Sequence, residues 1–177
     1  KMVTEQNDRL SKMVKTLLDM SELQTVSRDE AIMVDALVDE VLADLEPIAR
    51  EKDVELTGNC EAITIVGSDI LIYRLVYNLV ENAIKYNHPG GQVTVNASRK
   101  EKHVCLSVAD TGNGIPEELR ERVFEPFFRV DKSRSRALGG VGLGLALVHE
   151  IVRVHDGNIT VRSNPSGGTV FEVMFTQ

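Results

Sequence analysis

The sequence predicts an α+β protein, a two-layer α/β sandwich in which helices cover one face of a mixed sheet. Two observations support this class. Strands with alternating apolar residues are largely consecutive in the second half of the chain, and helical periodicities occur between and before the strands. In addition, 177 residues suffice for one domain with a sizeable core plus one extra element, which is an N-terminal amphipathic helix.

Composition narrows the class of protein. The net charge of −7 argues against a dedicated nucleic-acid binder, because phosphate contacts need a basic surface. Cys60 and Cys105 are far apart and lack metal-ligand spacing, so both are expected to be free thiols. No apolar run approaches the roughly 20 residues needed to cross a bilayer. The chain opens on Lys1, which leads us to expect a fragment of a longer protein.

The first expected element is the amphipathic helix at about residues 4–23. Its apolar residues include Leu10, Val14, Leu17 and Leu18 at helical spacing, without Gly or Pro. One such helix cannot bury its apolar stripe alone, so it must pack on a partner helix, on the rest of the domain, or on a second copy of the chain. We expect weak self-association through Leu10, Val14 and Leu17. We expect residues 1–26 to form this helical unit and residues 27–177 to form the main domain.

Short elements are expected next. Residues 31–34 suggest a strand, and Asp35 is a plausible N-cap for a helix that runs to about residue 52. Pro47 lies inside that pattern and should kink or break it. Residues 54–57 and 63–66 look like strands, and Gly58 with Asn59 between them suggests a turn.

A helix with a strongly apolar side follows. Ser68 or Asp69 can cap it, and the turn beginning at His88 ends it. Two alternating strands come next, with their apolar faces formed by Val93, Val95 and Ala97 and by Val104, Leu106 and Val108.

The segment after Pro116 is polar up to Leu138 apart from three phenylalanines. It suggests a mobile lid with an aromatic anchor. A helix at about 142–155 and two closing strands at about 158–163 and 169–175 complete the fold; the phenylalanines are Phe124, Phe127 and Phe128.

Three segments carry chemistry, and the first lies on the helix after Ser68. Asn78 and Asn82 are four residues apart and share one face, where amide oxygens suit Mg²⁺, although two surface amides are the simpler interpretation. Lys85 can meet a phosphate or pair with Glu81. Tyr86 can pack beside a base or cap the core.

The second segment begins at Asp110, where a strand ends. A carboxylate there can accept a hydrogen bond from the exocyclic amine of adenine, and Gly112 and Gly114 allow close backbone approach. A plain turn or a calcium loop is the alternative, but a calcium loop needs more carboxylates. Thr169, after two glycines, could also reach the base.

The third segment is a glycine-rich string that leads into a helix. Backbone N–H groups of Gly140, Gly142 and Gly144 can bind an anion at the helix N-terminus. The string is neither a P-loop nor a dinucleotide-binding fingerprint. The preceding basic cluster is either a solvated loop or a source of phosphate-neutralising arginine; it comprises Arg129, Lys132, Arg134 and Arg136.

These segments, in this order and spacing, resemble those of the ATP-binding catalytic domain of bacterial sensor histidine kinases, in the gyrase/Hsp90/histidine kinase/MutL superfamily. Residues 78–86 are similar to the N box, 110–116 to the first glycine box, 124–129 to the F box and 140–145 to the second glycine box. The resemblance starts at about Ala31 and implies a Bergerat-type fold with an ATP lid at about 116–141. The first helix resembles the second helix of the family's dimerisation hairpin.

The resemblance also implies roles. Asn82 would hold Mg²⁺, Asp110 would recognise adenine, and Asn78, Lys85 and Arg129 would serve catalysis near the phosphates. The residues implied to bind ATP are Asn78, Asn82, Lys85, Tyr86, Asp110, Gly112, Gly114, Ile115, Arg129, Gly140, Val141, Gly142, Leu143, Gly144, Leu145 and Thr169.

Three points separate the chain from the family pattern or bear on mechanism. Val141 stands where members often have Thr or Ser, so a hydroxyl contact to phosphate is lost. Asn78 stands where ATP-hydrolysing relatives carry a general-base glutamate, which favours transfer over hydrolysis. None of the four histidines has the context of the family's phosphoacceptor.

The leading hypothesis is therefore a histidine kinase domain that uses ATP and Mg²⁺ to phosphorylate a histidine on a dimerisation domain absent from this chain. A nucleotide-gated binding module without transfer is the alternative. An ATPase of the gyrase type is disfavoured by Asn78, and a serine kinase of the anti-sigma type by the first helix. The expected parent is a homodimer that pairs with a response regulator, does not bind nucleic acid, and is anchored in the bacterial plasma membrane with this portion in the cytoplasm.

Overall fold

The computed structural model describes residues 2–131 and 142–177 and contains a five-stranded mixed sheet. The strand order is β2-β4-β5-β7-β6, in which β2 and β4 are parallel and the other neighbours are antiparallel. The strands are β2 (Val54–Cys60), β4 (Gly91–Lys100), β5 (His103–Asp110), β6 (Asn158–Ser163) and β7 (Thr169–Thr176). The predicted α+β class is confirmed.

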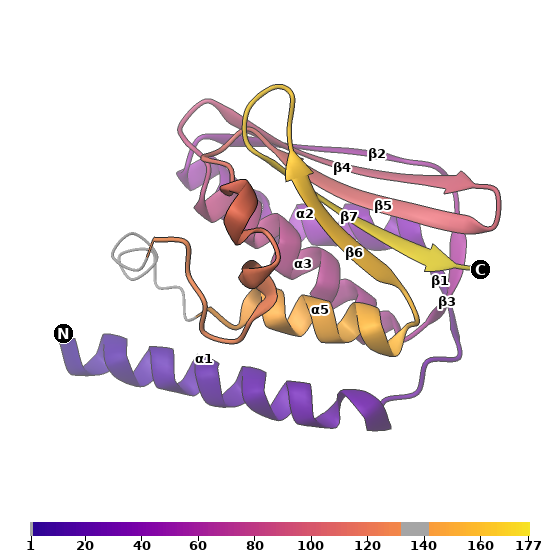
Figure 1. Cartoon of the computed structure of the whole chain (residues 1–177), viewed down its shortest axis with the longest axis horizontal. Coiled ribbons are helices and arrows are strands. Elements are labelled where there is room, and N and C mark those ends of the chain that lie inside the picture. The colour runs from indigo at the N-terminus through magenta and orange to yellow at the C-terminus, as the bar shows by residue number, and fades with distance from the viewer. Residues whose placement is uncertain (1, 132–141) are drawn as a thin grey trace.

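Three helices form a layer on one face of this sheet (Figure 1). They are α2 (Val34–Glu51), α3 (Asp69–Lys85) and α5 (Gly144–Val154). A separate two-stranded antiparallel sheet pairs β1 (Glu30–Met33) with β3 (Thr64–Gly67). The helix α1 (Met2–Glu22) and the 3₁₀ turn η1 (Leu23–Thr25) precede β1, and α1 lies next to α5 on the outside of the helical layer.

The core lies between the large sheet and its helices, where the sequence periodicities placed it. The predicted apolar faces of β4 and β5 are buried, and α3 buries eight side chains. Every second side chain of the strands is apolar and points toward the helices, and the apolar stripe of α3 points toward the sheet. Each layer therefore buries its apolar side against the other. The buried residues of α3 are Leu71, Ile72, Leu75, Val76, Leu79, Val80, Ala83 and Ile84.

The start of α3 is held by a side-chain cap and by the histidine that directly follows α5. The Ser68 hydroxyl accepts a hydrogen bond from Leu71 N–H at 3.3 Å, which confirms Ser68 as the N-cap. Ser68 N–H in turn donates to His155 Nε2 at 3.0 Å, while His155 Nδ1 lies 2.8 Å from Ile151 O. Burial lowers the pKa of His155, and this hydrogen-bond pattern requires the neutral ring with its proton on Nδ1.

The predicted turn at Gly58 and Asn59 is wrong. Both residues lie inside β2, which continues to Cys60 and pairs in parallel with β4. A side chain at Gly58 would place its Cβ 3.1 Å from Leu42 Cδ1 on α2. The glycine therefore marks a close approach of strand and helix, which is the other common meaning of glycine in a strand.

The predictions for α2 also need correction. Asp35 is not its N-cap, because the helix already begins at Val34 after Met33, and no side chain caps it. Pro47 does not end the helix, which runs on to Glu51. Leu45 and Ala49 on either side of Pro47 are both fully buried, so packing on the sheet outweighs the loss of one backbone hydrogen bond.

The segment 116–131 contains two short 3₁₀ turns, η2 (Glu117–Leu119) and η3 (Arg122–Phe124). The rest of the expected lid, with Lys132, Arg134 and Arg136, lies outside the described residues. Phe124 supplies the expected aromatic anchor, since its ring packs edge-on to Phe171. Phe127 does not, because 48% of it is exposed.

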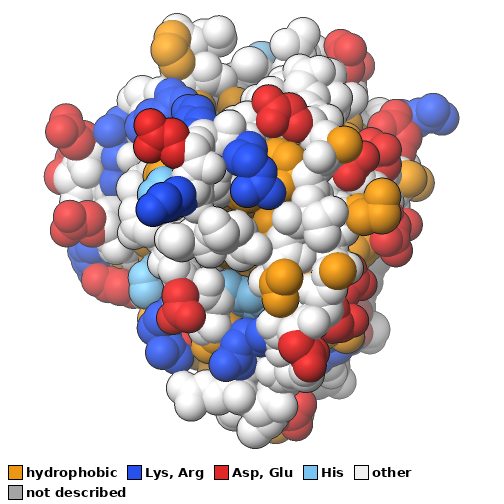
Figure 2. Space-filling view, turned by 90° about the vertical axis from the view of Figure 1, so that its right-hand side faces the viewer, with side chains coloured by type: hydrophobic (Ala, Val, Ile, Leu, Met, Phe, Trp, Pro, Cys, Tyr) orange, Lys and Arg blue, Asp and Glu red, His pale blue; other side chains and the backbone are white. Residues whose placement is uncertain are grey.

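No described helix is long and apolar enough to span a bilayer, and no three acidic, His or Cys side chains of the described residues gather as metal ligands. Cys60 and Cys105 are free thiols. On the face shown in Figure 2, apolar side chains are interspersed with charged ones.

Candidate functional site

A cavity of about 520 Å³ opens where the C-terminal half of α3 meets the end of β5 and the start of α5. Most predicted site residues line it, although they come from five segments of the chain. The predicted residues that line this pocket are Asn78, Asn82, Lys85, Tyr86, Asp110, Gly114, Ile115, Arg129, Gly142, Gly144, Leu145 and Thr169. The three chemical segments identified in the sequence therefore meet at one site.

Two predicted residues do not line the pocket, and two others cannot be placed. Leu143 is fully buried and does not line the cavity, so its side chain is not available to a ligand in the pocket. Gly112 also lies behind the wall, although its N–H supports Asp110. Gly140 and Val141 fall outside the described residues.

Asp110 is the buried acceptor at one end of the pocket. Its Oδ1 accepts hydrogen bonds from Gly112 N–H at 2.9 Å and from Thr169 N–H at 3.2 Å. No described residue donates to Oδ2, so this oxygen remains for a ligand. Burial raises the pKa of Asp110, and the two N–H donors offset part of that rise.

The backbone around Asp110 is fixed from the turn before β7. Asn164 Nδ2 donates to the Asp110 carbonyl at 2.7 Å. Gly168 has a φ of +95°, and a Cβ there would lie 2.2 Å from the same carbonyl and 2.6 Å from Asp110 Oδ1. Only glycine allows this approach without displacement, so the turn holds the carboxylate in one orientation.

The other end of the pocket brings the asparagines of α3 to the start of α5. Asn78 Nδ2 donates to Arg74 O at 2.7 Å, which fixes the amide rotamer. Asn78 Oδ1 lies 3.3 Å from the position that a Cβ at Gly144 would take, so the asparagine lies close against the first turn of α5. Helix N-termini favour anions and amide oxygens favour Mg²⁺, so a metal-bound phosphate suits this end; Asn82 also lines it.

Charged side chains of both signs line the same region. Lys85 Nζ lies 3.4 Å from Glu81 Oε1, which is the alternative partner that the sequence allowed. Both side chains are less than a third exposed and both line the pocket. The ion pair holds Lys85 at the wall, where its ammonium can also reach an anion. Arg129 is in the wall as well.

The F-box segment covers the pocket from the side. Phe128 lines the cavity, and the guanidinium of Arg122 lies 4.6 Å from its ring centroid. Phe127 N–H donates to Gly142 O at 2.8 Å. This bond joins the segment before the undescribed residues to the segment after them.

Some lining residues were not predicted. Lys12 and Thr16 come from α1, and no local pattern in the sequence connects that helix with the site. Asn113 and Glu81 lie within the predicted motifs, so their sequence neighbours could have identified them. The other unpredicted residues are Pro116, Val123, Phe128, Val130, Asp131 and Phe171.

A buried carboxylate at one end and a helix N-terminus with amide oxygens at the other define a site for an adenine nucleotide. Comparison with known proteins agrees. The family described as histidine kinase-, DNA gyrase B- and HSP90-like ATPases matches residues 67–177, and the chain belongs to this family.

The curated relatives that the chain resembles include sensor histidine kinases. The sensor-like histidine kinase SenX3 of Mycolicibacterium smegmatis is 37% identical over 175 residues, which cover 97% of this chain and 45% of SenX3. The chain thus spans less than half the length of this relative. The chain is a catalytic ATPase domain of the histidine kinase type.

Two solved structures share the fold. Full-length ShkA in complex with AMPPNP has a TM-score of 0.80 and 28% identity, covering 97% of this chain and 36% of ShkA. The histidine kinase ThkA in complex with the response regulator TrrA has a TM-score of 0.79 and 25% identity, covering 99% of this chain and 49% of ThkA. Both matches include the N-terminal helix region.

Proposed function

We propose that this domain binds ATP·Mg²⁺ and transfers the γ-phosphoryl group to a histidine on a dimerisation domain. The observation that carries the proposal is the buried Asp110, whose Oδ1 is saturated by two N–H donors while Oδ2 remains available. An acceptor at this place suits the exocyclic amine of adenine. The AMPPNP bound to ShkA, a structure of the same fold, adds support.

The chemistry would depend on positioning and charge. An imidazole nitrogen attacks the γ-phosphorus, a P–N bond forms, and the bond to the β,γ-bridging oxygen breaks as ADP leaves with the electron pair. The imidazole ring then loses the proton carried by its second nitrogen, the one that did not attack. Lys85 and Arg129 would neutralise phosphate charge, while Asn78 cannot take a proton from water and so does not promote hydrolysis.

Phosphotransfer in trans tests this function. The chain is incubated with the parent's helical hairpin that carries the acceptor histidine, with γ-labelled ATP and Mg²⁺. We expect acid-labile label on the hairpin and none when the acceptor histidine is replaced by alanine. Tight nucleotide binding without any transfer would instead favour the nucleotide-gated module.

Asn82→Ala is expected to remove the Mg²⁺-dependent part of ATP affinity. Asn82 lines the pocket, and its amide oxygen is the hard ligand that we assign to the metal. Calorimetric titration with a non-hydrolysable ATP analogue should show the Kd rising about tenfold or more with Mg²⁺ present and changing little without it. Asn96→Ala, on β4 away from the pocket, is the control. An Asn82→Ala protein with the wild-type response to Mg²⁺ would refute the metal role.

Self-association through α1 is expected to be weak and to depend on its outward row. Leu10, Val14 and Leu17 follow i, i+4, i+7 spacing and are 56%, 53% and 44% exposed. Sedimentation at high concentration should show a monomer–dimer equilibrium that Leu10→Asp abolishes and Thr4→Asp, on the flank of the helix, preserves. A clean monomer for the wild type would contradict this prediction.

The remaining assignments concern the parent protein. We infer a homodimer that passes phosphate to a response regulator receiver domain, since ThkA forms a complex with the response regulator TrrA. We also infer that the parent is anchored in the bacterial plasma membrane and that this domain faces the cytoplasm. A pull-down of the full-length parent with its candidate receiver domains tests the first inference, and membrane fractionation tests the second.

A further inference from the structure

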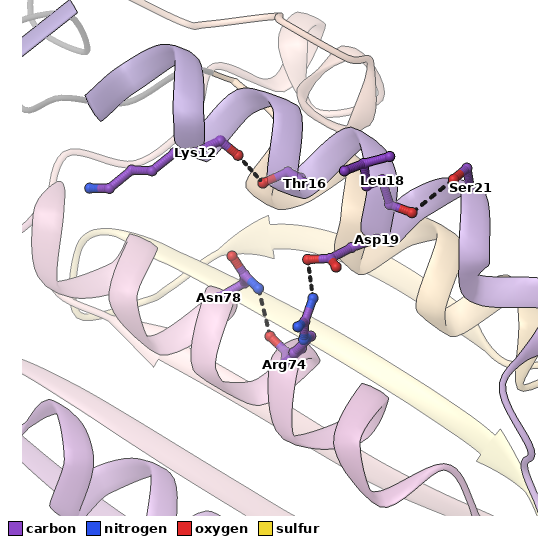
Figure 3. Close-up of polar contacts among 7 residues, drawn as sticks. All are labelled: Lys12, Thr16, Leu18, Asp19, Ser21, Arg74 and Asn78. Atoms are coloured by element: carbon purple, nitrogen blue, oxygen red, sulfur yellow. Dashed lines mark hydrogen bonds and ion pairs between the residues drawn. The ribbon is translucent and has the colours of Figure 1, made fainter. Parts of the chain in front are cut away.

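The helix α1 forms part of the wall of the nucleotide pocket. Lys12 and Thr16, one turn apart, both line the cavity, although the ATPase family match begins only at residue 67. Figure 3 shows the Lys12 side chain on the side of α1 that faces α3 and Asn78. A helix outside the matched segment therefore contributes a cation to the site.

An ion pair anchors α1 in this position. Asp19 accepts a hydrogen bond from the guanidinium of Arg74 on α3, and the two side chains are 23% and 30% exposed. The carbonyl of Arg74 accepts from Asn78 Nδ2 at 2.7 Å, as Figure 3 shows. Arg74 therefore contacts both Asp19 on α1 and the Asn78 amide, which lies beside the start of α5.

Lys12 is the group on α1 that remains available to a ligand. The hydroxyl of Thr16 is already used, since it donates to Lys12 O at 2.9 Å. Among the described residues the Lys12 ammonium has no ion-pair partner. Lys12 lines the same cavity as Asn78 and Asn82 of α3.

The charges in the pocket wall favour a further cation such as the Lys12 ammonium. The wall carries the carboxylates of Glu81, Asp110 and Asp131. Its cations are Lys12, Lys85 and Arg129, and Lys85 is already paired with Glu81. A nucleoside triphosphate would add three to four negative charges. An additional cation in the wall lowers the electrostatic cost of binding them.

We propose that Lys12 is a phosphate-binding residue of the nucleotide site, delivered from α1 and held there by the Asp19–Arg74 pair. The proposal rests on the proposed ATP binding and deepens it. It assigns part of the affinity for the polyphosphate chain to a helix outside the matched ATPase segment. Any movement of α1 relative to α3 then changes the affinity for ATP.

Calorimetric titration of Lys12→Gln tests the assignment. We expect the Kd for a non-hydrolysable ATP analogue to rise about threefold to tenfold at low ionic strength, and the increase to shrink as salt is added, because Lys12 is solvent-exposed. Adenosine, which lacks phosphate, should bind both proteins equally. Lys15→Gln is the matched control, since Lys15 lies on the same helix but does not line the pocket.

The anchoring role has its own test. Asp19→Asn should reproduce part of the loss of affinity for the ATP analogue. The double variant with Lys12→Gln and Asp19→Asn should lose less binding free energy than the sum of the two single losses, because a released helix no longer brings Lys12 to the pocket.

Equal Kd values for Lys12→Gln and the wild type would overturn the proposal. Equal losses for Lys12→Gln and Lys15→Gln would also overturn it, by showing a general charge effect. A wild type that binds no nucleotide at all would instead overturn the proposed function, and this inference with it.

Discussion

Asp110→Asn is expected to abolish adenine-nucleotide binding while leaving the fold intact. The asparagine carbonyl can still accept the N–H groups of Gly112 and Thr169 at 2.9 and 3.2 Å. The NH₂ group then replaces Oδ2 and presents a donor to the amine of adenine. The variant loses a charged acceptor, and its NH₂ group lies opposite the amine of adenine, so that two donors face each other. Together these changes should weaken binding about a hundredfold or more.

The measurement is calorimetric titration with ATP and GTP analogues. The wild type should prefer the adenine nucleotide, because the carboxylate rejects the guanine carbonyl. Asp53→Asn is the matched control, since Asp53 is exposed and its φ of +56° suits asparagine. If Asp110→Asn bound ATP as tightly as the control, the assignment of the adenine end would be wrong.

The same carboxylate predicts a pH dependence of binding. Burial raises the pKa of Asp110, and only the ionised form offers Oδ2 as an acceptor. Adenosine affinity should therefore fall as the pH drops through this raised pKa, above the range in which an ordinary aspartate titrates. Adenosine is the appropriate probe because its affinity does not report the titration of phosphates.

Gly168→Ala is expected to destabilise the protein and to disrupt the site. A Cβ at this position would lie 2.2 Å from Asp110 O and 2.7 Å from Gly112 N, both backbone atoms that cannot move independently. The φ of +95° adds backbone strain. We expect a loss of about 2–4 kcal/mol in the free energy of unfolding, together with a large loss of adenine affinity.

The neighbouring glycine separates strain from steric overlap. Gly167 has a φ of +90°, but a Cβ there would meet nothing within 4 Å. Gly167→Ala should therefore lose only the strain component and retain nucleotide binding. Urea denaturation and titration of both variants give the comparison, and equal behaviour of the two would contradict the role assigned to the Gly168 contact.

Local sequence determined much of this domain. The alternation in β4 and β5, the apolar stripe of α3 and the Ser68 cap could all be predicted, because period and capping depend on residues within one or two turns. Many residues that line the candidate pocket could be identified for a similar reason. Asn78 and Asn82 share a helix face by their spacing, and Asp110 stands where a strand ends.

Contacts between distant segments were decided by the tertiary structure. Gly58 and Asn59 are residue types typical of a turn, but Gly58 lies in a strand that packs closely against Leu42 of α2. The buried packing of α2 also allows that helix to continue past Pro47. His155 at Ser68 and Lys12 at the pocket likewise depend on which elements pack together. Periodicity and capping are short-range properties of the chain, whereas pairing and packing are settled by the apolar area that the whole fold buries, and that sum cannot be read from any one segment.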